Sequence, residues 1–173
     1  MKALFLTAIL LFLLPDARAC SCVTENIPQK QQIAKAYAQA SLIFTGRVTA
    51  VEDVTSMDTT QLTSPATGRD TLLISRRQFR RYTFAVQRQL KGVAVGPTVM
   101  IVTDGPGSSC GVSYAVGSER LVYAYTVDMT QDLAGVVKKV APYFVTGMCT
   151  RTQELRYTQA AELKQLRKLA KAG

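Results

Sequence analysis

The chain has 173 residues, of which 47% are hydrophobic, and its 21 Lys and Arg against 12 Asp and Glu give a formal net charge of +9. The hydrophobic fraction is sufficient for a folded core, and the absence of histidine excludes a Ser-His-Asp triad, a Cys-His pair and any zinc site with an imidazole ligand. Because carboxylates are also few and scattered, no acid–base pair stands out, and we expect a binding or inhibitory protein without a cofactor of its own, not an enzyme.

Residues 1–19 have the pattern of a secretory signal peptide. Lys2 precedes an apolar run that ends at Leu14, and Ala17-Arg18-Ala19 has the A-x-A form of a cleavage site. The run is shorter than the about 20 apolar residues that span a bilayer, and no later stretch comes close. We therefore expect a secreted protein, extracellular or periplasmic, with no transmembrane segment. Its mature part would be one domain over residues 20–173 that begins on Cys20.

A bacterial lipoprotein is the alternative for this end of the chain, because lipoproteins also begin on a cysteine that is then acylated. Their processing signal usually has small residues at the two positions before the cysteine, and here one of them is Arg18. The arginine argues against acylation. A lipidated, structural or partner-binding domain stays open as an alternative.

The predicted elements begin with a short amphipathic helix over residues 27–41. Pro28 suits its first turn, and apolar residues recur at helical spacing at Ile33, Ala36, Tyr37 and Ala40. A β-rich stretch follows over residues 41–53, with Gly46 as a bulge or bend. Residues 54–71 are rich in Ser, Thr and Asp and contain Pro65 and Gly68. We expect this segment to be a long loop.

Alternation or short apolar runs predict four further strands, over residues 80–92, 97–104, 119–128 and 135–149. A glycine-rich loop, residues 105–118, lies between the second and the third of these four strands. The chain then ends in a basic helix, residues 157–172, with an apolar face of Ala160, Leu163, Leu166, Leu169 and Ala170. Five strands with bends suit a small closed barrel, which leaves no exposed sheet edge. The expected fold is therefore mainly β, with one helix before the strands and one after them.

Four cysteines, Cys20, Cys22, Cys110 and Cys149, indicate two disulfides in a secreted chain. A bond between Cys20 and Cys22 would close a very tight ring, so each is expected to pair with a distant partner, Cys110 or Cys149. A four-cysteine zinc site and a redox role for Cys-Ser-Cys are weaker alternatives, since redox thiols usually have C-x-x-C spacing.

Several separate stretches resemble, in the same order, the N-terminal domain of the tissue inhibitors of metalloproteinases, which belong to the netrin-like group. They are "CSCVT" at 20–24, "LIFTGRV" at 42–48, "RYTFAVQRQLKG" at 81–92, "SSCGVSYAVGSERLVYAY" at 108–125 and "YFVTGMC" at 143–149. The resemblance runs from Cys20 to about Leu155. It implies a five-stranded OB-fold barrel and the disulfide pairs Cys20–Cys110 and Cys22–Cys149.

The resemblance also implies a function, inhibition of a zinc metalloprotease. The α-amine and carbonyl oxygen of Cys20 would chelate the zinc of the target, which keeps one coordination position open. Ser21 would point into the pocket beside that zinc. A protease-binding ridge is implied for Cys20, Ser21, Cys22, Val23, Thr24, Ser109, Cys110 and Gly111.

Three departures separate this chain from the animal members of that family. Thr24 stands where they usually have proline, the third disulfide of their N-terminal domain is missing, and a single basic helix replaces their cysteine-rich second domain. These losses suggest a short, single-domain, bacterial relative. A netrin-like module that binds glycans or an envelope partner without inhibiting a protease stays open as an alternative, because fold does not fix function.

A basic cluster is the second feature of functional interest, and its members are Arg76, Arg77, Arg80, Arg81, Arg88 and Lys91. One interpretation is a solvated strand and loop. The other is a patch for a sulfated glycan or an anionic surface. We expect a monomer with no nucleic-acid partner, because a secreted chain seldom meets nucleic acid.

Overall fold

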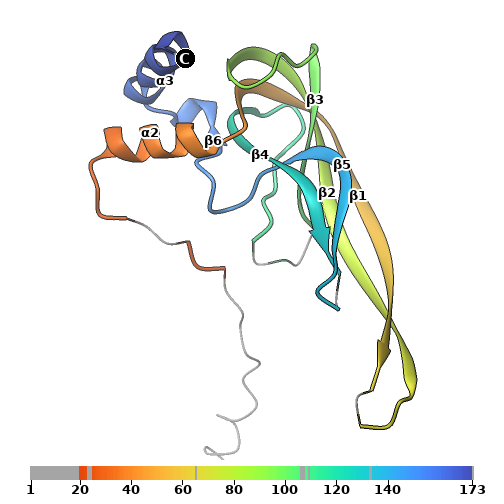
Figure 1. Ribbon diagram of the computed structural model, residues 1–173. Coiled ribbons are helices and arrows are strands. Elements are labelled where there is room, and N and C mark those ends of the chain that lie inside the picture. The colour runs from red at the N-terminus through yellow and green to blue at the C-terminus, as the bar shows by residue number, and fades with distance from the viewer. Residues whose placement is uncertain are drawn as a thin grey trace, which may run out of the picture.

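A closed ring of five strands organises the chain (Figure 1). The computed structural model describes residues 20–22, 25–64, 66–105, 108, 110–132 and 134–172, so the expected signal peptide lies outside the described residues. The elements are α2 (Gln29–Gln39), β1 (Leu42–Thr63), β2 (Asp70–Lys91), β3 (Thr98–Asp104), β4 (Glu119–Gln131), β5 (Val137–Val145), β6 (Gln153–Glu154), the 3-10 turn η1 (Leu155–Tyr157) and α3 (Ala160–Ala172).

The ring follows the order β1-β2-β3-β5-β4 and closes through a pairing of β4 with β1. Every pairing is antiparallel except that of β3 with β5, which is parallel and short. The short strand β6 adds to the outer edge of β4. The expectation of a mainly β fold with a helix at each end is therefore confirmed.

Two apolar clusters fill the two sides of the same strands. Inside the ring, alternate residues of β1, β2 and β3 meet, and the rings of Phe44 and Phe84 pack edge to face with centroids 5.4 Å apart. The residues that alternate with these inward-facing ones along the strands point the other way. Ile43 of β1 and Tyr123 of β4, for example, face the helices and form the second cluster with Ile33 and Leu166. Burial of both faces explains the continuous apolar runs at 42–44 and 121–124.

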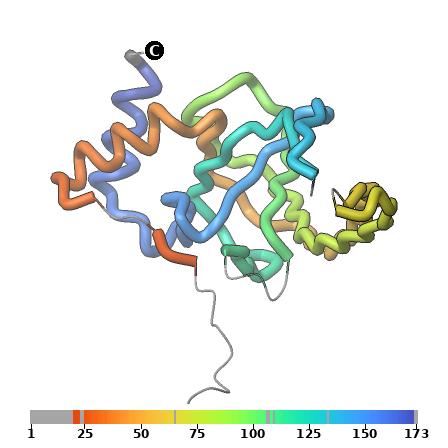
Figure 2. The backbone as a smooth tube through the Cα atoms, turned by 60° about the horizontal axis from the view of Figure 1, so that its bottom comes forward, coloured from red at the N-terminus to blue at the C-terminus, as the bar shows by residue number. Residues whose placement is uncertain are grey.

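The two helices lie side by side at one end of the molecule (Figures 1 and 2). Ile33 of α2 and Leu166 of α3 are buried against the ring, and Gln165 Nε2 donates to the carbonyl oxygen of Lys30 at 2.6 Å. The expected helix at 27–41 is thus confirmed, although Pro28 precedes its first residue. The expected apolar face of the last helix is narrower than predicted, because Ala160 and Ala170 are exposed.

Gly46 lies at a β-bulge, as expected from the sequence. The register of β1 against β2 shifts between Thr45 and Gly46. A Cβ at Gly46 would lie 2.8 Å from the carbonyl oxygen of Ala85, a distance too short for any other residue without a shift of the backbone. The bulge bends β1 and lets it pair with both β2 and β4 in closing the ring.

The expected loop at 54–71 is wrong, because most of it is sheet. β1 continues to Thr63, β2 already begins at Asp70, and the pairing runs without interruption from Val54↔Phe79 to Thr63↔Asp70. Threonine, which favours extended backbone, is frequent here, and Asp70 accepts hydrogen bonds from Gln61 and Thr63. Only residues 64–69 connect the strands. We call the paired segments 54–63 and 70–79 the arm, and Figures 1 and 2 show it projecting from the ring on the side away from the helices.

Smaller corrections concern the last part of the chain. β5 is shorter than the strand predicted over 135–149, because its end leaves the sheet before Cys149. The pairings of β6 with β4 were not predicted, since two residues give no periodicity. Within the described part of the chain, no helix has the length and apolar character needed to cross a membrane.

Candidate functional site

Two disulfides attach the N-terminal strip to two neighbouring segments of the chain. Cys20 pairs with Cys110 in the loop between β3 and β4, and Cys22 pairs with Cys149 in the connection between β5 and β6. The Cα atoms of each pair are 5.2 Å apart, within the ordinary range for a disulfide. This is the pairing that the resemblance implies. Ser21, between the two cysteines, is exposed.

The loop that carries Cys110 is held closely against β2 and β3. The N–H of Gly105 donates to the carbonyl oxygen of Gln78 at 2.9 Å, and Ser108 Oγ donates to Asp104 and accepts from the N–H of Cys110, both at 3.3 Å. A Cβ at Gly111 would lie 2.5 Å from the carbonyl oxygen of Asp104. Glycine is therefore required for this close approach of two backbone segments.

The segment that carries Cys149 is fixed by a group of threonines. Thr146 Oγ1 lies 3.0 Å from Thr150 Oγ1 and 2.9 Å from Thr152 Oγ1, and it donates to the carbonyl oxygen of Tyr123 at 3.0 Å. The N–H of Met148 donates to the carbonyl oxygen of Cys110 at 3.1 Å. The two disulfide-bearing segments therefore contact each other directly, and the strip at 20–22 is attached to a single support.

The structure describes five of the eight residues in the ridge that the resemblance implies. Cys20, Cys22, Cys110 and Gly111 are half-buried, and Ser21 is exposed. Val23, Thr24 and Ser109 lie outside the described residues. Beside the Cys20–Cys110 bond there is a hollow of about 400 Å³, whose lining includes Phe79, Tyr143 and Met148.

Met148 was not among the predicted site residues. It is 46% exposed and adjacent to Cys149. Its position before the last cysteine was visible in the sequence, but the sequence predicted only a strand over residues 135–149, with no indication of which of its side chains are exposed. The early end of β5 brings this apolar side chain to the surface next to both disulfides.

The chemistry of this region contains no thiolate, because all four cysteines are in disulfides. Among the described residues, no group of three or more His, Cys, Asp or Glu side chains is placed to hold a metal ion. The carboxylate of Asp104 accepts a hydrogen bond from Ser108, and Glu25 forms an ion pair with Lys35. The polar atoms that the strip itself can offer to a partner are its backbone groups and the hydroxyl of Ser21.

The basic cluster does not form one free patch. Arg80 donates to both carboxylate oxygens of Asp53 at 2.6 and 3.1 Å, and Arg81 donates to Glu52 at 3.2 Å. The Arg80 guanidinium holds the pKa of Asp53 below its usual value. Arg77 donates to the carbonyl oxygen of Gln131 at 3.3 Å.

The remaining members of the basic cluster are separated from one another. Lys91 donates to the carbonyl oxygens of Tyr37 and Ala38 in the last turn of α2, which places its charge favourably at a helix C-terminus. Arg76 and Arg88 are exposed and lie at distant positions on β2. Successive side chains of a strand also alternate between its two faces. The structure therefore spreads these six cations over several surfaces.

In comparisons with protein-family models and with curated proteins, the chain matches no family model and no curated relative.

Proposed function

We propose that this protein is a secreted inhibitor of zinc metalloproteases that acts through the amino terminus of a chain beginning at Cys20. The single observation that carries the proposal is the double attachment of the strip. Cys20 and Cys22 are each bonded to a different supporting segment, and the exposed Ser21 lies between them. A terminus held in this way loses little freedom when it binds a partner, which favours affinity.

The chemistry of a chain terminus suits this role. An α-amino group and the carbonyl oxygen of the same residue can bind one metal ion together, and a catalytic zinc keeps a position open for such ligands. The amine has an ordinary pKa of about 7.7–8, so its neutral form is accessible at neutral pH. A free thiol on Cys20 would compete for the metal, and the bond to Cys110 removes it.

We assign the remaining contacts as follows. Ser21 enters the pocket beside the zinc, where its small side chain permits a broad range of targets. Val23 and Thr24 continue along the cleft, and Ser109, Cys110 and Gly111 flank the strip. We also propose that the ring is an OB-fold barrel of the netrin-like class, because its strand order β1-β2-β3-β5-β4-β1 supports this fold.

The test is an inhibition assay with protein exported to an oxidising compartment. Intact mass before and after reduction first establishes a start at Cys20, the absence of acyl groups and two disulfides. Zinc metalloproteases are then titrated with the protein while cleavage of a peptide substrate is followed. We expect stoichiometric inhibition that strengthens as the pH rises through about 8, because the amine must lose its proton to bind zinc.

The matched control is the same protein with one alanine added before Cys20. This extension moves the α-amine away from the zinc and leaves the disulfides and the ring unchanged, so inhibition should be lost. An Arg88→Ala variant, altered at an exposed residue outside the ridge, should inhibit like the parent. Equal inhibition by the extended and parent proteins, or none by the parent, would contradict the proposal. No inhibition together with an acylated Cys20 would favour a lipid-anchored binding module.

A further inference from the structure

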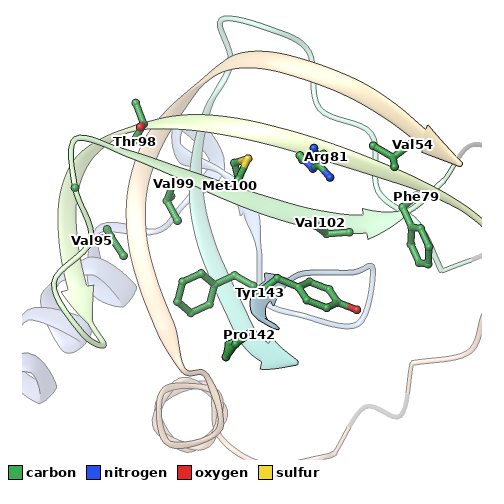
Figure 3. Close-up of a pocket in the computed structure, with 12 residues that line it drawn as sticks. Val54, Phe79, Arg81, Val95, Thr98, Val99, Met100, Val102, Pro142 and Tyr143 are labelled. Atoms are coloured by element: carbon green, nitrogen blue, oxygen red, sulfur yellow. The ribbon is translucent and has the colours of Figure 1, made fainter. Parts of the chain in front are cut away.

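A second hollow, larger than the one beside Cys20, lies between β3 and β5. Its volume is about 670 Å³, and Figure 3 shows Val95 and Val99 toward one end, Phe79 and Val54 toward the other, and Tyr143 across from them. This size is in the range of small-molecule sites, which are usually concave and mostly apolar. We call this hollow the groove.

The groove exists because β3 and β5 diverge. They pair only at Ile101↔Phe144 and Val102↔Val145. Pro142, just before these residues, has no N–H for a ladder and lies where the register of β5 against β4 also shifts. In the described part of the chain, β3 from Thr98 to Met100 pairs with β2 alone, so the space beside it is not closed by a strand.

The walls of the groove are apolar and are left partly open. Met100 is 57% exposed, and Val54, Phe79, Val102 and Tyr143 are half-buried. A contiguous apolar surface of this kind on a soluble protein usually marks a binding site. The direction of β3 gives the groove a length of roughly 13 Å from Thr98 to Val102, at about 3.3 Å per residue. An extended apolar chain therefore fits its shape.

One cation lies in this apolar surrounding. Arg81 lines the groove beside Val102, its partner in the sheet, and Figure 3 places it between Met100 and Val54. Its only ion pair among the described residues is with Glu52, through a single contact of 3.2 Å, and the Glu52 side chain is 65% exposed. Arg81 therefore keeps donors for a second acceptor, since a guanidinium has five N–H groups.

We propose that the groove binds a single-chain carboxylate amphiphile, that is, a free fatty acid. The carboxylate pairs with Arg81, and the hydrocarbon chain lies along β3 toward Val95. The positive charge of Arg81 favours an anionic head group over a neutral one. A carboxylate that loses water on binding needs a charged partner, and the guanidinium provides it. Glu52 competes with the ligand for Arg81 and so lowers the affinity. Cys20 does not line the groove, although Phe79, Val102 and Tyr143 line both hollows. The proposal does not rest on protease inhibition.

The test is calorimetric titration of the exported protein with decanoate, below the concentration at which decanoate forms micelles, and with decanol as the neutral analogue. We expect one saturable decanoate site and weaker binding of decanol. Arg81→Gln should weaken decanoate binding about tenfold or more, the loss expected for a charge-assisted hydrogen bond, and leave decanol unchanged. Glu52→Gln should tighten decanoate binding several-fold, an increase that misfolding cannot produce.

The control variant is Arg76→Gln, which makes the same change on the same strand at an exposed residue that does not line the groove. It should bind decanoate like the parent. The absence of saturable binding would overturn the proposal. Equal affinity for decanoate and decanol, unaffected by Arg81→Gln, would also overturn it, since the groove would then be an apolar site without anion selection.

The location is tested by NMR of methionine methyl groups labelled with ¹³C. Four methionines are exposed among the residues that the structure describes, and of these Met100 lines the groove; the others are Met57 on the arm, Met129 on β4 and Met148 near the disulfides. Decanoate should shift the Met100 signal and leave the other three in place. A shift at Met57 without one at Met100 would place the ligand on the arm and reject the groove.

Discussion

Arg151 and Glu162 form a two-pronged ion pair that joins α3 to the segment after the second disulfide. Arg151 Nε and Nη2 donate to the two carboxylate oxygens of Glu162 at 3.1 and 3.0 Å, and Glu162 is only 1% exposed. Tyr123 donates its hydroxyl to the same carboxylate at 2.7 Å, and Gln153 adds a bond at 3.2 Å. Burial, together with this hydrogen bond to Glu162, raises the pKa of Tyr123. The last helix is therefore fixed to a segment that begins two residues after Cys149.

We predict that Glu162→Leu lowers the free energy of unfolding by about 3–5 kcal/mol, the usual cost of removing one partner from a buried ion pair. The loss arises because Arg151 and Tyr123 keep their donors but lose the acceptor. The double variant Glu162→Leu/Arg151→Met should recover much of it, since no unpaired charge is then left. Urea unfolding of Glu162→Leu, Arg151→Met and the double variant measures the coupling free energy between the two side chains.

Arg47→Gln is the matched control, because Arg47 also donates to a glutamate, Glu119, but here the side chains are 57% and 36% accessible to solvent. Exposed ion pairs contribute little to stability, so the unfolding curve should stay close to that of the parent. If the double variant is as unstable as Glu162→Leu alone, the apolar packing of α3 and not the ion pair would account for the loss.

The sequence predicted the elements whose burial follows a regular period. Ile33 and Ala36 mark the buried side of α2, and the alternation at Tyr82 and Phe84 marks the inner side of β2. Glu162 could not be found in this way. An acidic residue in the first turn of an amphipathic helix is usually solvated, and only the tertiary arrangement brings Arg151, eleven positions away, to cover it.

The arm was missed for a different physical reason. Apart from Phe79, which also pairs with Asp104 of β3, its two strands pair only with each other, so their side chains need no apolar alternation. Exposed Thr and Asp in the segment therefore indicated a loop. The groove could not be predicted either. The sequence predicts strands that contain Val102 and Tyr143, but the exposure of these side chains depends on where β3 and β5 separate. In the candidate site, the cysteines were found from their type and position, but the exposure of Met148 was not.

Removing the arm should leave the ring intact. We predict that replacing residues 56–77 by Asn-Gly, which joins the paired Thr55 and Gln78 through a two-residue turn, yields a protein that forms both disulfides and unfolds cooperatively. Gln78 is retained because its carbonyl oxygen accepts from Gly105. Thermal unfolding measured by circular dichroism should have a midpoint within a few degrees of the parent. A molten or disulfide-scrambled product would mean that the arm is needed to set the register of β1 and β2.

Gly111→Ala should disturb the loop that presents Cys110. The added Cβ would lie 2.5 Å from the carbonyl oxygen of Asp104, and relief of such a clash requires backbone shifts that cost about 1–3 kcal/mol. Denaturant unfolding measures the loss, and peptide mapping measures the fraction of molecules with the Cys20–Cys110 bond. Gly96→Ala is the control, since its Cβ would meet no atom within 4 Å. Equal behaviour of the two variants would show that the loop can move without consequence.

The ion pair of Asp53 with Arg80 predicts a dependence of stability on pH. Two hydrogen bonds from Arg80 lower the pKa of Asp53 in the folded protein, relative to about 3.9 in the unfolded chain. A lowered folded-state pKa adds stability above pH 4, and this contribution is lost as the pH falls through the folded value. Asp53→Asn should therefore unfold at a lower temperature than the parent at pH 7.

The difference between Asp53→Asn and the parent should close by about pH 2, where the parent carboxyl is protonated as well. Calorimetric scans at several pH values measure it. Asp58→Asn is the control, because it makes the same change farther along β1 at an exposed residue without an ion pair among those described. Its difference in unfolding temperature from the parent should not change with pH in this way. If the Asp53→Asn difference persists at low pH, it does not arise from the charge of the carboxylate, because the parent carboxyl is then neutral like the amide.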